Sequence, residues 1–258
     1  MAVEYAPRGL IGVLTPQANT TVEPEFSILW PPGYAMINAR MVSDKGTVQE
    51  RLMDYFHGLD AVLTRFANAP LSAVAFACTG ASYLVGAAAE DDTVARLSER
   101  LGVPFVTAGL AVADGLNALG AKRIGLVSPY PPALTEASVP YWQDRGFDVA
   151  GVASASLDQT QFHPIYSIPA GRTTETFDRL EAERVDAIVM LGTGMPTLET
   201  ILERAGAVGV PLLSCMLALA WRTVAAVDGR APDAADLQGW IAGEDWKARF
   251  AAQRPPRR

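Results

Sequence analysis

Residues 72–80 read SAVAFACTG, and residues 186–194 of the same chain read DAIVMLGTG. Each stretch is an apolar run followed by a Thr-Gly turn. Apolar runs of this length, bounded by turn residues, are typical of strands buried on both faces of a parallel sheet. Cys78 stands before the first turn, and Gly192 stands at the matching position of the second. The two stretches therefore predict two related halves that differ in one chemical group.

Two further motifs repeat in the same order. Residues 11–16 (IGVLTP) match residues 124–129 (IGLVSP), and residues 102–104 match residues 209–211, both reading GVP. Three matched pairs in one order indicate an internal duplication. We expect a first half over residues 1–119 and a second over residues 120–216, with a C-terminal helix at about 217–258 packing back on the first half.

Strand-like runs alternate with amphipathic stretches along the chain, and this alternation predicts βαβ units and parallel sheets. The expected strands are residues 11–15, 35–41, 72–77, 104–107, 123–127, 149–155, 187–191 and 211–214. The expected helices are residues 48–67, 93–101, 111–119, 135–144, 173–183, 197–205 and 217–227. We therefore expect an α/β fold of two pseudo-symmetric, doubly wound parallel-sheet halves, with the active site in the cleft between them.

Composition narrows the class of protein. The chain has 258 residues, of which 50% are hydrophobic, so it can bury a large core. Its net charge of −7 and the lack of a basic stripe argue against a nucleic-acid partner, although one positive pocket still suits a small anion. No uncharged run long enough for a membrane span and no signal-peptide pattern appear, so we expect a cytoplasmic protein without membrane contact.

The cysteines and histidines are few. Two distant cysteines, Cys78 and Cys215, do not form a disulfide framework and fit a reducing compartment. With His57 and His163 they show no zinc-ligand spacing, so we expect no metal. Ligands collect at the carboxyl ends of the strands in an open α/β sheet, which is where Cys78 falls. We expect Cys78 to be catalytic, with its pKa lowered by the start of the following helix.

The chain resembles the aspartate/glutamate racemase superfamily, and within it the maleate cis-trans isomerase and arylmalonate decarboxylase branch. The resemblance covers about residues 9–228. It rests on residues 15–21 (TPQANTT), the turn Cys78-Thr79-Gly80, residues 128–130 (SPY) and residues 192–197 (GTGMPT). It implies an enzyme without metal or organic cofactor that binds a small carboxylate between its halves and uses cysteine thiolates. It also implies a homo-oligomer, a dimer or larger.

The cysteine pattern differs from both members of that branch. Maleate isomerases carry two cysteines, of which the first matches Cys78 and the second falls at Gly192. Arylmalonate decarboxylases carry a single cysteine, at the second of these positions, with glycine at the first. We expect a maleate-type cis-trans isomerase with Cys78 as nucleophile. The alternatives are a decarboxylase of a 2-substituted malonate, a racemase-like isomerase, and, less favoured, a non-catalytic carboxylate-binding protein.

Further substrate-binding residues follow from the resemblance and from their places at strand ends. We expect Asn19 and Tyr130 to donate to substrate carboxylates, although Asn19 also suits a helix cap. The turns Thr79-Gly80 and Thr193-Gly194 expose consecutive N–H groups that suit a carboxylate or an enediolate.

Four other residues have side chains that could matter to the site. Phe162 stands where maleate isomerases usually have an asparagine, which favours an apolar substituent on the substrate. Cys215 is assigned to core packing and His57 to a structural helix. His163 is the one alternative group expected to titrate near neutral pH, but we favour an exposed loop histidine without a role in the site.

Overall fold

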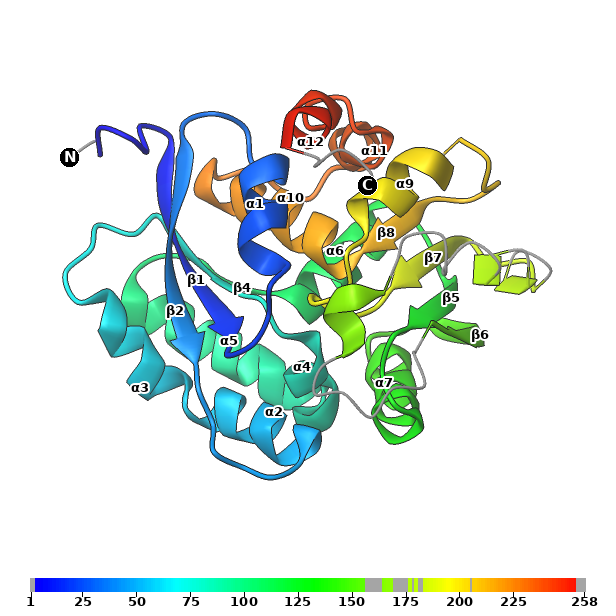
Figure 1. The fold of residues 1–258 in the computed structure, drawn as a ribbon, viewed down its shortest axis with the longest axis horizontal. Helices are drawn as coiled ribbons and strands as arrows, with labels where there is room; N and C mark the ends of the chain where they lie inside the picture. Colours follow the sequence, from blue (N-terminus) through cyan, green and yellow to red (C-terminus); the bar gives the residue numbers. More distant parts are fainter. Residues whose placement is uncertain are drawn as a thin grey trace.

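The computed structural model describes residues 3–155, 164–168, 176–177, 179–180, 183–204 and 206–253. Two four-stranded parallel sheets carry the fold, with the strand orders β2-β1-β3-β4 and β6-β5-β7-β8 (Figure 1). The first sheet contains β1 (Gly9–Pro16), β2 (Tyr34–Met41), β3 (Ala73–Phe76) and β4 (Phe105–Thr107). The second contains β5 (Arg123–Ser128), β6 (Asp148–Ser154), β7 (Ala187–Met190) and β8 (Leu212–Ser214). The expected α/β fold of two matching parallel sheets is confirmed.

The helices follow the sequence prediction less closely. They are α1 (Val22–Leu29), α2 (Val48–His57), α3 (Leu59–Leu63), α4 (Thr79–Val85), α5 (Ala87–Leu101), α6 (Ala108–Ala118), α7 (Pro132–Asp144), α9 (Leu198–Arg204), α10 (Cys215–Val227), α11 (Ala234–Ala242) and α12 (Lys247–Gln253), with 3-10 turns η1 (Thr64–Phe66) and η2 (Pro164–Ser167). The helix expected over residues 48–67 is divided at Gly58, whose N–H ends α2 on the Asp54 carbonyl. Helices α1 and α4 were missed, and the C-terminal helix expected at about 217–258 is divided into three, α10, α11 and α12. Most of the helix expected over residues 173–183 lies outside the described residues.

The alternation of side chains along β3 decides which way Cys78 faces. Val74 and Phe76 belong to the same buried cluster as Cys78, whereas Ala75 and Ala77 face a second cluster on the other side of the sheet. This is the two-residue period of a strand. The second cluster continues from β1 to β7 and includes Trp221, so the two sheets share one core.

Helix α10 joins the halves. It follows the last strand of the second sheet, but it packs on α1 and α6 and contacts β3 and β4 of the first sheet (Figure 1). Helix α11 packs on α6 and α9, and α12 packs on α1. None of the helices in the described part of the chain has both the length and the hydropathy that crossing a membrane requires.

A buried polar network fixes the helix that begins at Cys78. The Glu90 side chain on α5 is fully buried and accepts hydrogen bonds from Ser82 on α4 (2.6 Å) and from Tyr141 on α7 (2.5 Å). Arg145, directly after α7, adds an ion pair to Glu90 at 2.7 Å. A buried carboxylate is stable only when it is paired in this way. The network therefore ties α4 and α5 of the first half to α7 of the second.

Candidate active site

Cys78 lies between strand β3 and helix α4, at the carboxyl edge of the first sheet. The side chain is 3% exposed, and the backbone N–H groups of Ala81 and Gly80 point at its sulfur. Burial raises the pKa of the Cys78 thiol to about 12, and the two N–H groups offset only part of the rise. The expected lowering of this pKa is therefore wrong, because exclusion of water from the sulfur outweighs two backbone donors.

The raised pKa of Cys78 predicts how the free protein reacts with iodoacetamide. Only the thiolate is a good nucleophile, so alkylation of Cys78 should be slow at pH 7 and should accelerate as the pH rises toward 12. Peptide mapping by mass spectrometry at several pH values measures this rate. A rate that already levels off below pH 8 would show that the thiol is ionised in the free protein.

Gly192 lies two residues after β7, the matching strand of the second half, and its φ is +86°. A Cβ atom at this position would lie 3.1 Å from side-chain carbons of Ile165 and Pro129 and 3.2 Å from the Tyr130 hydroxyl. These contacts are tighter than side chains normally make, and the backbone conformation itself disfavours any residue but glycine. The second half therefore lacks a thiol at residue 192, and a side chain there would strain the backbone and crowd its neighbours.

Two equivalent contacts cross between the halves. The Thr79 and Tyr130 hydroxyls lie 2.9 Å apart, and the Asn19 amide nitrogen donates to the Thr193 hydroxyl at 3.4 Å. In each contact the threonine of one half's Thr-Gly turn meets the residue that follows the first strand of the other half. Thr193 also donates to the carbonyl of Ala77 at 2.7 Å, next to Cys78. The structure thus brings these predicted site residues together.

The Asn19 side chain also caps helix α1. Its oxygen accepts from the backbone N–H groups of Thr21 (2.9 Å) and Val22 (3.2 Å). The amide nitrogen is thereby turned toward Thr193, and it carries a second hydrogen for a ligand. The cap and the predicted binding role are therefore compatible.

The turn glycines meet close neighbours. A Cβ atom at Gly80 would lie 2.9 Å from Leu52, and one at Gly194 would lie 2.5 Å from the Tyr166 ring. Glycine is needed at both turns because helix α2 and the residues of η2 approach the backbone directly.

Sequence reasoning missed four residues around Cys78. Tyr55 is buried on α2 and Tyr166 is half-buried on η2; burial and then the nearby Cys78 sulfur raise the pKa of each phenol. The Gln17 backbone reaches Tyr55, and Arg51 lies close enough to both phenols to lower their pKa values slightly. Arg51 is itself 7% exposed. The one available signal was the four-residue spacing of Arg51 and Tyr55, which places both on one face of a helix.

Cys215 is buried, as core packing predicts, but it also borders the site. It is the first residue of α10, and burial raises its pKa to about 12. The Gly192 N–H and the Thr79 and Tyr83 hydroxyls face its sulfur and offset part of that rise. The side chain therefore belongs both to the core and to the edge of the site.

The remaining predicted residues do not join this group. Phe162 and His163 lie outside the described residues. His57 is exposed at the end of α2, where its ring contacts Phe56. Within the described residues, no group of three or more His, Cys, Asp or Glu side chains is arranged to hold a metal ion.

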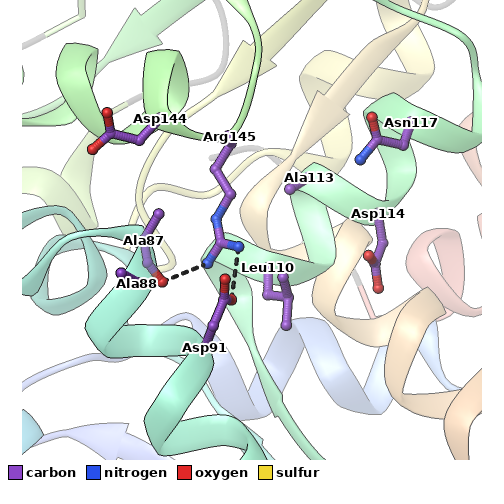
Figure 2. A pocket seen from close by; sticks show the side chains of 9 residues that line it. All are labelled: Ala87, Ala88, Asp91, Leu110, Ala113, Asp114, Asn117, Asp144 and Arg145. Atoms are coloured by element: carbon purple, nitrogen blue, oxygen red, sulfur yellow. Dashed lines mark hydrogen bonds and ion pairs between the residues drawn. The ribbon is translucent and has the colours of Figure 1, made fainter.

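A pocket of about 550 Å³ lies elsewhere, among α5, α6 and α7 (Figure 2). Figure 2 shows Arg145 reaching across it to Asp91 at 2.7 Å and to the carbonyl of Ala87 at 3.3 Å. None of the predicted site residues lines this pocket. It is therefore separate from the group around Cys78.

Glu25 is a buried carboxyl group whose hydrogen-bond partner lies just after the Thr193-Gly194 turn. It accepts a hydrogen bond from the Thr197 N–H at 2.9 Å, and its other oxygen makes no hydrogen bond within the described residues. Burial raises the pKa of Glu25 to about 8, although hydrogen bonds from Thr197 and Leu198 lower it in part. Helix α1 also carries Glu23, so no pattern in the sequence distinguishes Glu25 as the buried carboxyl group.

Glu25 should make the stability of the protein depend on pH. The unfolded chain ionises this carboxyl near pH 4.5, whereas the folded protein keeps its proton up to about pH 8. The free energy of unfolding should therefore be highest, as far as Glu25 is concerned, below pH 4.5. It should fall by at most about 5 kcal/mol as the pH rises from 4.5 to 8. Glu25→Gln should remove this decline in urea unfolding, while the exposed control Glu99→Gln should keep it. An identical pH slope for Glu25→Gln and the parent protein would contradict the assignment.

Comparison with known proteins gives a consistent picture. A family model described as arylmalonate decarboxylase matches residues 11–238. The chain is 25% identical over 217 residues to a maleate isomerase of Geobacillus stearothermophilus, covering 79% of this chain and 86% of that protein. It is also 25% identical over 236 residues to an arylmalonate decarboxylase of Bordetella bronchiseptica, covering 89% and 95%.

A solved structure adds the fold of one such relative. It is a mutant of Nocardia farcinica maleate cis-trans isomerase with a covalently bound succinylcysteine intermediate. Its TM-score is 0.75 at 24% identity, covering 85% of this chain and 92% of that one. The likeness extends over both sheets.

Proposed function

Because the chain belongs to the arylmalonate decarboxylase family, we propose that it is a cysteine-dependent enzyme acting on a small dicarboxylate, in the manner of a maleate cis-trans isomerase. Its relatives place it among isomerases and carboxy-lyases. The observation that carries the choice is Cys78, a thiol at the end of β3 whose sulfur faces two backbone N–H groups. A relative captured with a succinylcysteine intermediate supports covalent addition to an alkene at such a thiol.

The polar groups around Cys78 fit a substrate with two carboxylates. The Asn19 amide contacts the Thr193-Gly194 turn at the Thr193 hydroxyl, and Arg51 lies near Tyr55, whose phenol is close to the Cys78 sulfur. Amide and backbone N–H groups hold a carboxylate by hydrogen bonds, and a buried arginine adds charge. These groups fix both ends of a short diacid against the sulfur.

Isomerisation then needs three steps at the alkene. The Cys78 thiol loses its proton to water at its small exposed surface, and the thiolate adds to one alkene carbon to form a C–S bond. This addition moves the alkene electron pair onto the neighbouring carbon. The former double bond becomes single and rotates. Elimination restores the double bond in the trans arrangement and returns the electron pair to sulfur.

Decarboxylation of a 2-substituted malonate is the second candidate, and Gly192 favours it. This reaction needs one proton donor after carbon dioxide leaves, so one thiol facing the substrate is sufficient. Cys78 stands on the opposite half from the cysteine of the known decarboxylases. The product should therefore be the opposite enantiomer, and formation of the same enantiomer would exclude this geometry.

Proton NMR in deuterated water distinguishes these reactions. The panel contains maleate, 2-methylmaleate, phenylmalonate, methyl-phenylmalonate, and both enantiomers of aspartate and glutamate. Conversion of an alkene to its trans isomer supports the proposed function, and loss of carbon dioxide from a malonate replaces it with the decarboxylase. Exchange at the α-carbon of an amino acid would indicate a racemase. Binding without any conversion or exchange would leave a carboxylate-binding protein.

A further inference from the structure

We propose that Tyr130, Thr79 and Cys215 form a proton relay that protonates the substrate from the side of residue 192. The proposal rests on the proposed isomerase function. It assigns Cys215 a part in the chemistry although this cysteine lies in neither Thr-Gly turn.

The Tyr130 hydroxyl borders the position at which a side chain on residue 192 would begin. It lies 3.2 Å from the position of a Cβ atom there, and the Tyr130 side chain is half-buried. It also lies close enough to Cys78 for the sulfur to raise the pKa of the phenol. A proton on the Tyr130 oxygen therefore lies close to both Cys78 and residue 192, the matching positions of the two halves.

Thr79 connects this hydroxyl to Cys215. The Thr79 and Tyr130 oxygens are 2.9 Å apart, and either hydroxyl can donate to the other. The Thr79 hydroxyl also faces the Cys215 sulfur. The three groups form a continuous path for a proton from sulfur to the phenol.

Tyr83 is a second, independent sign that this corner is built for a changing charge. Its side chain is 4% exposed, and its hydroxyl makes no hydrogen bond of normal geometry in the described part of the chain. It faces the Thr79 hydroxyl and the Cys215 sulfur. A buried hydroxyl is costly without a partner, and a thiolate on Cys215 would supply an acceptor. The Gly192 N–H faces the same sulfur and would stabilise the same charge.

Sulfur is the chemically favoured end of the path. Burial raises the pKa values of both groups, and the nearby Cys215 sulfur raises that of Tyr130 further, whereas the Gly192 N–H and the Thr79 and Tyr83 hydroxyls lower that of Cys215. A threonine hydroxyl is a much weaker acid than a thiol. A negative charge created in this group is therefore most stable on Cys215, next to the Gly192 N–H.

The step balances without any oxidant or reductant. The Cys78 thiolate pair forms the C–S bond, and the alkene pair takes the Tyr130 proton to form a C–H bond on the neighbouring carbon. Tyr130 regains a proton from Thr79, and Thr79 regains one from Cys215, so the charge moves from Cys78 to Cys215. After rotation, the relay runs backward: the C–H proton returns to Tyr130, and protons pass through Thr79 until Cys215 is a thiol again. The C–H pair re-forms the double bond, and the C–S pair returns to Cys78.

Substitution of Cys215 tests the relay. Cys215→Ala should lower kcat for isomerisation about a hundred-fold, within the usual range for general acid catalysis, with KM changed less than about threefold. Cys215→Ser, which keeps a weakly acidic hydroxyl, should restore part of kcat. The control Thr223→Val removes another buried hydroxyl of α10, bonded to the Leu219 carbonyl, and should leave kcat unchanged.

A second readout separates chemistry from packing. Alkylation of Cys78 by iodoacetate needs the thiolate and the carboxylate site, but it needs no proton donor. Its rate should be the same in Cys215→Ala and in the parent protein. A parallel fall of kcat and alkylation would show that Cys215 is only structural, and an unchanged kcat would also overturn the relay. If the parent protein alkylates normally but isomerises no dicarboxylate, the proposed function fails and the relay fails with it.

Discussion

Cys78→Ala should lower kcat/KM by at least about a thousand-fold, equivalent to about 4 kcal/mol of lost transition-state stabilisation. The reason is that the C–S bond of the proposed mechanism has no other sulfur to form on. Cys78 lies at the strand end beside both Thr-Gly turns, whereas Cys215 lies behind Thr79. Cys78→Ser should lose nearly as much, because an unassisted hydroxyl is a poor nucleophile.

The fold must survive this substitution for the loss to be informative. Cys78 packs with Leu134 and Phe76, so removal of its sulfur should cost about 1–2 kcal/mol of the free energy of unfolding. Circular dichroism and thermal unfolding check this. A folded Cys78→Ala protein that retains more than a tenth of the parent activity would remove Cys78 from the chemistry.

Gly192→Cys should lower both stability and activity, although it restores the two-cysteine pattern of maleate isomerases. The backbone at residue 192 has φ +86°, and the new side chain would meet Ile165, Pro129 and the Tyr130 hydroxyl. Backbone strain and overpacking together should cost about 2–4 kcal/mol. Displacement of the Tyr130 hydroxyl would also break its contact with Thr79, so we expect kcat to fall rather than rise.

Gly120→Cys is the matched control for the strain. Gly120 also has a positive φ, at +71°, but a Cβ atom there would meet no atom within 4 Å. Its loss of stability in urea unfolding should therefore be smaller than that of Gly192→Cys, and its activity should equal that of the parent. A more active Gly192→Cys enzyme would show that the space beside Tyr130 accepts a thiol.

The sheets were predictable because most of their strands, all but the edge strands β2 and β6, are buried along nearly their whole length. Runs such as AVAF at Ala73–Phe76 and AIVM at Ala187–Met190 are apolar throughout, and the chain repeats them in one order. Helix α4 was not predictable in the same way, because its small residues show no amphipathic period. Tertiary packing against α2, α5 and α7 forms it instead.

The site was predictable where its residues follow strands and unpredictable where tertiary packing supplies them. Cys78, Thr79, Asn19, Tyr130 and Thr193 meet because strand ends share one edge of each sheet. Tyr55 and Tyr166 come from a helix and a turn that no motif connects to Cys78. The predicted direction of the pKa shift of Cys78 was wrong for the same reason. The sequence shows the helix start that stabilises a thiolate, but only the structure shows how far water is excluded from the sulfur.

Mapping the covalent intermediate tests the role of Cys78 most directly. The protein is mixed with maleate, quenched in acid and digested with trypsin, which places the two cysteines in separate peptides, residues 66–96 and 205–222. Mass spectrometry should find one added dicarboxylate on the peptide that contains Cys78 and none on the peptide that contains Cys215. Turnover of maleate with an adduct on Cys215, or with no adduct on Cys78 at any quench time, would contradict the proposed mechanism.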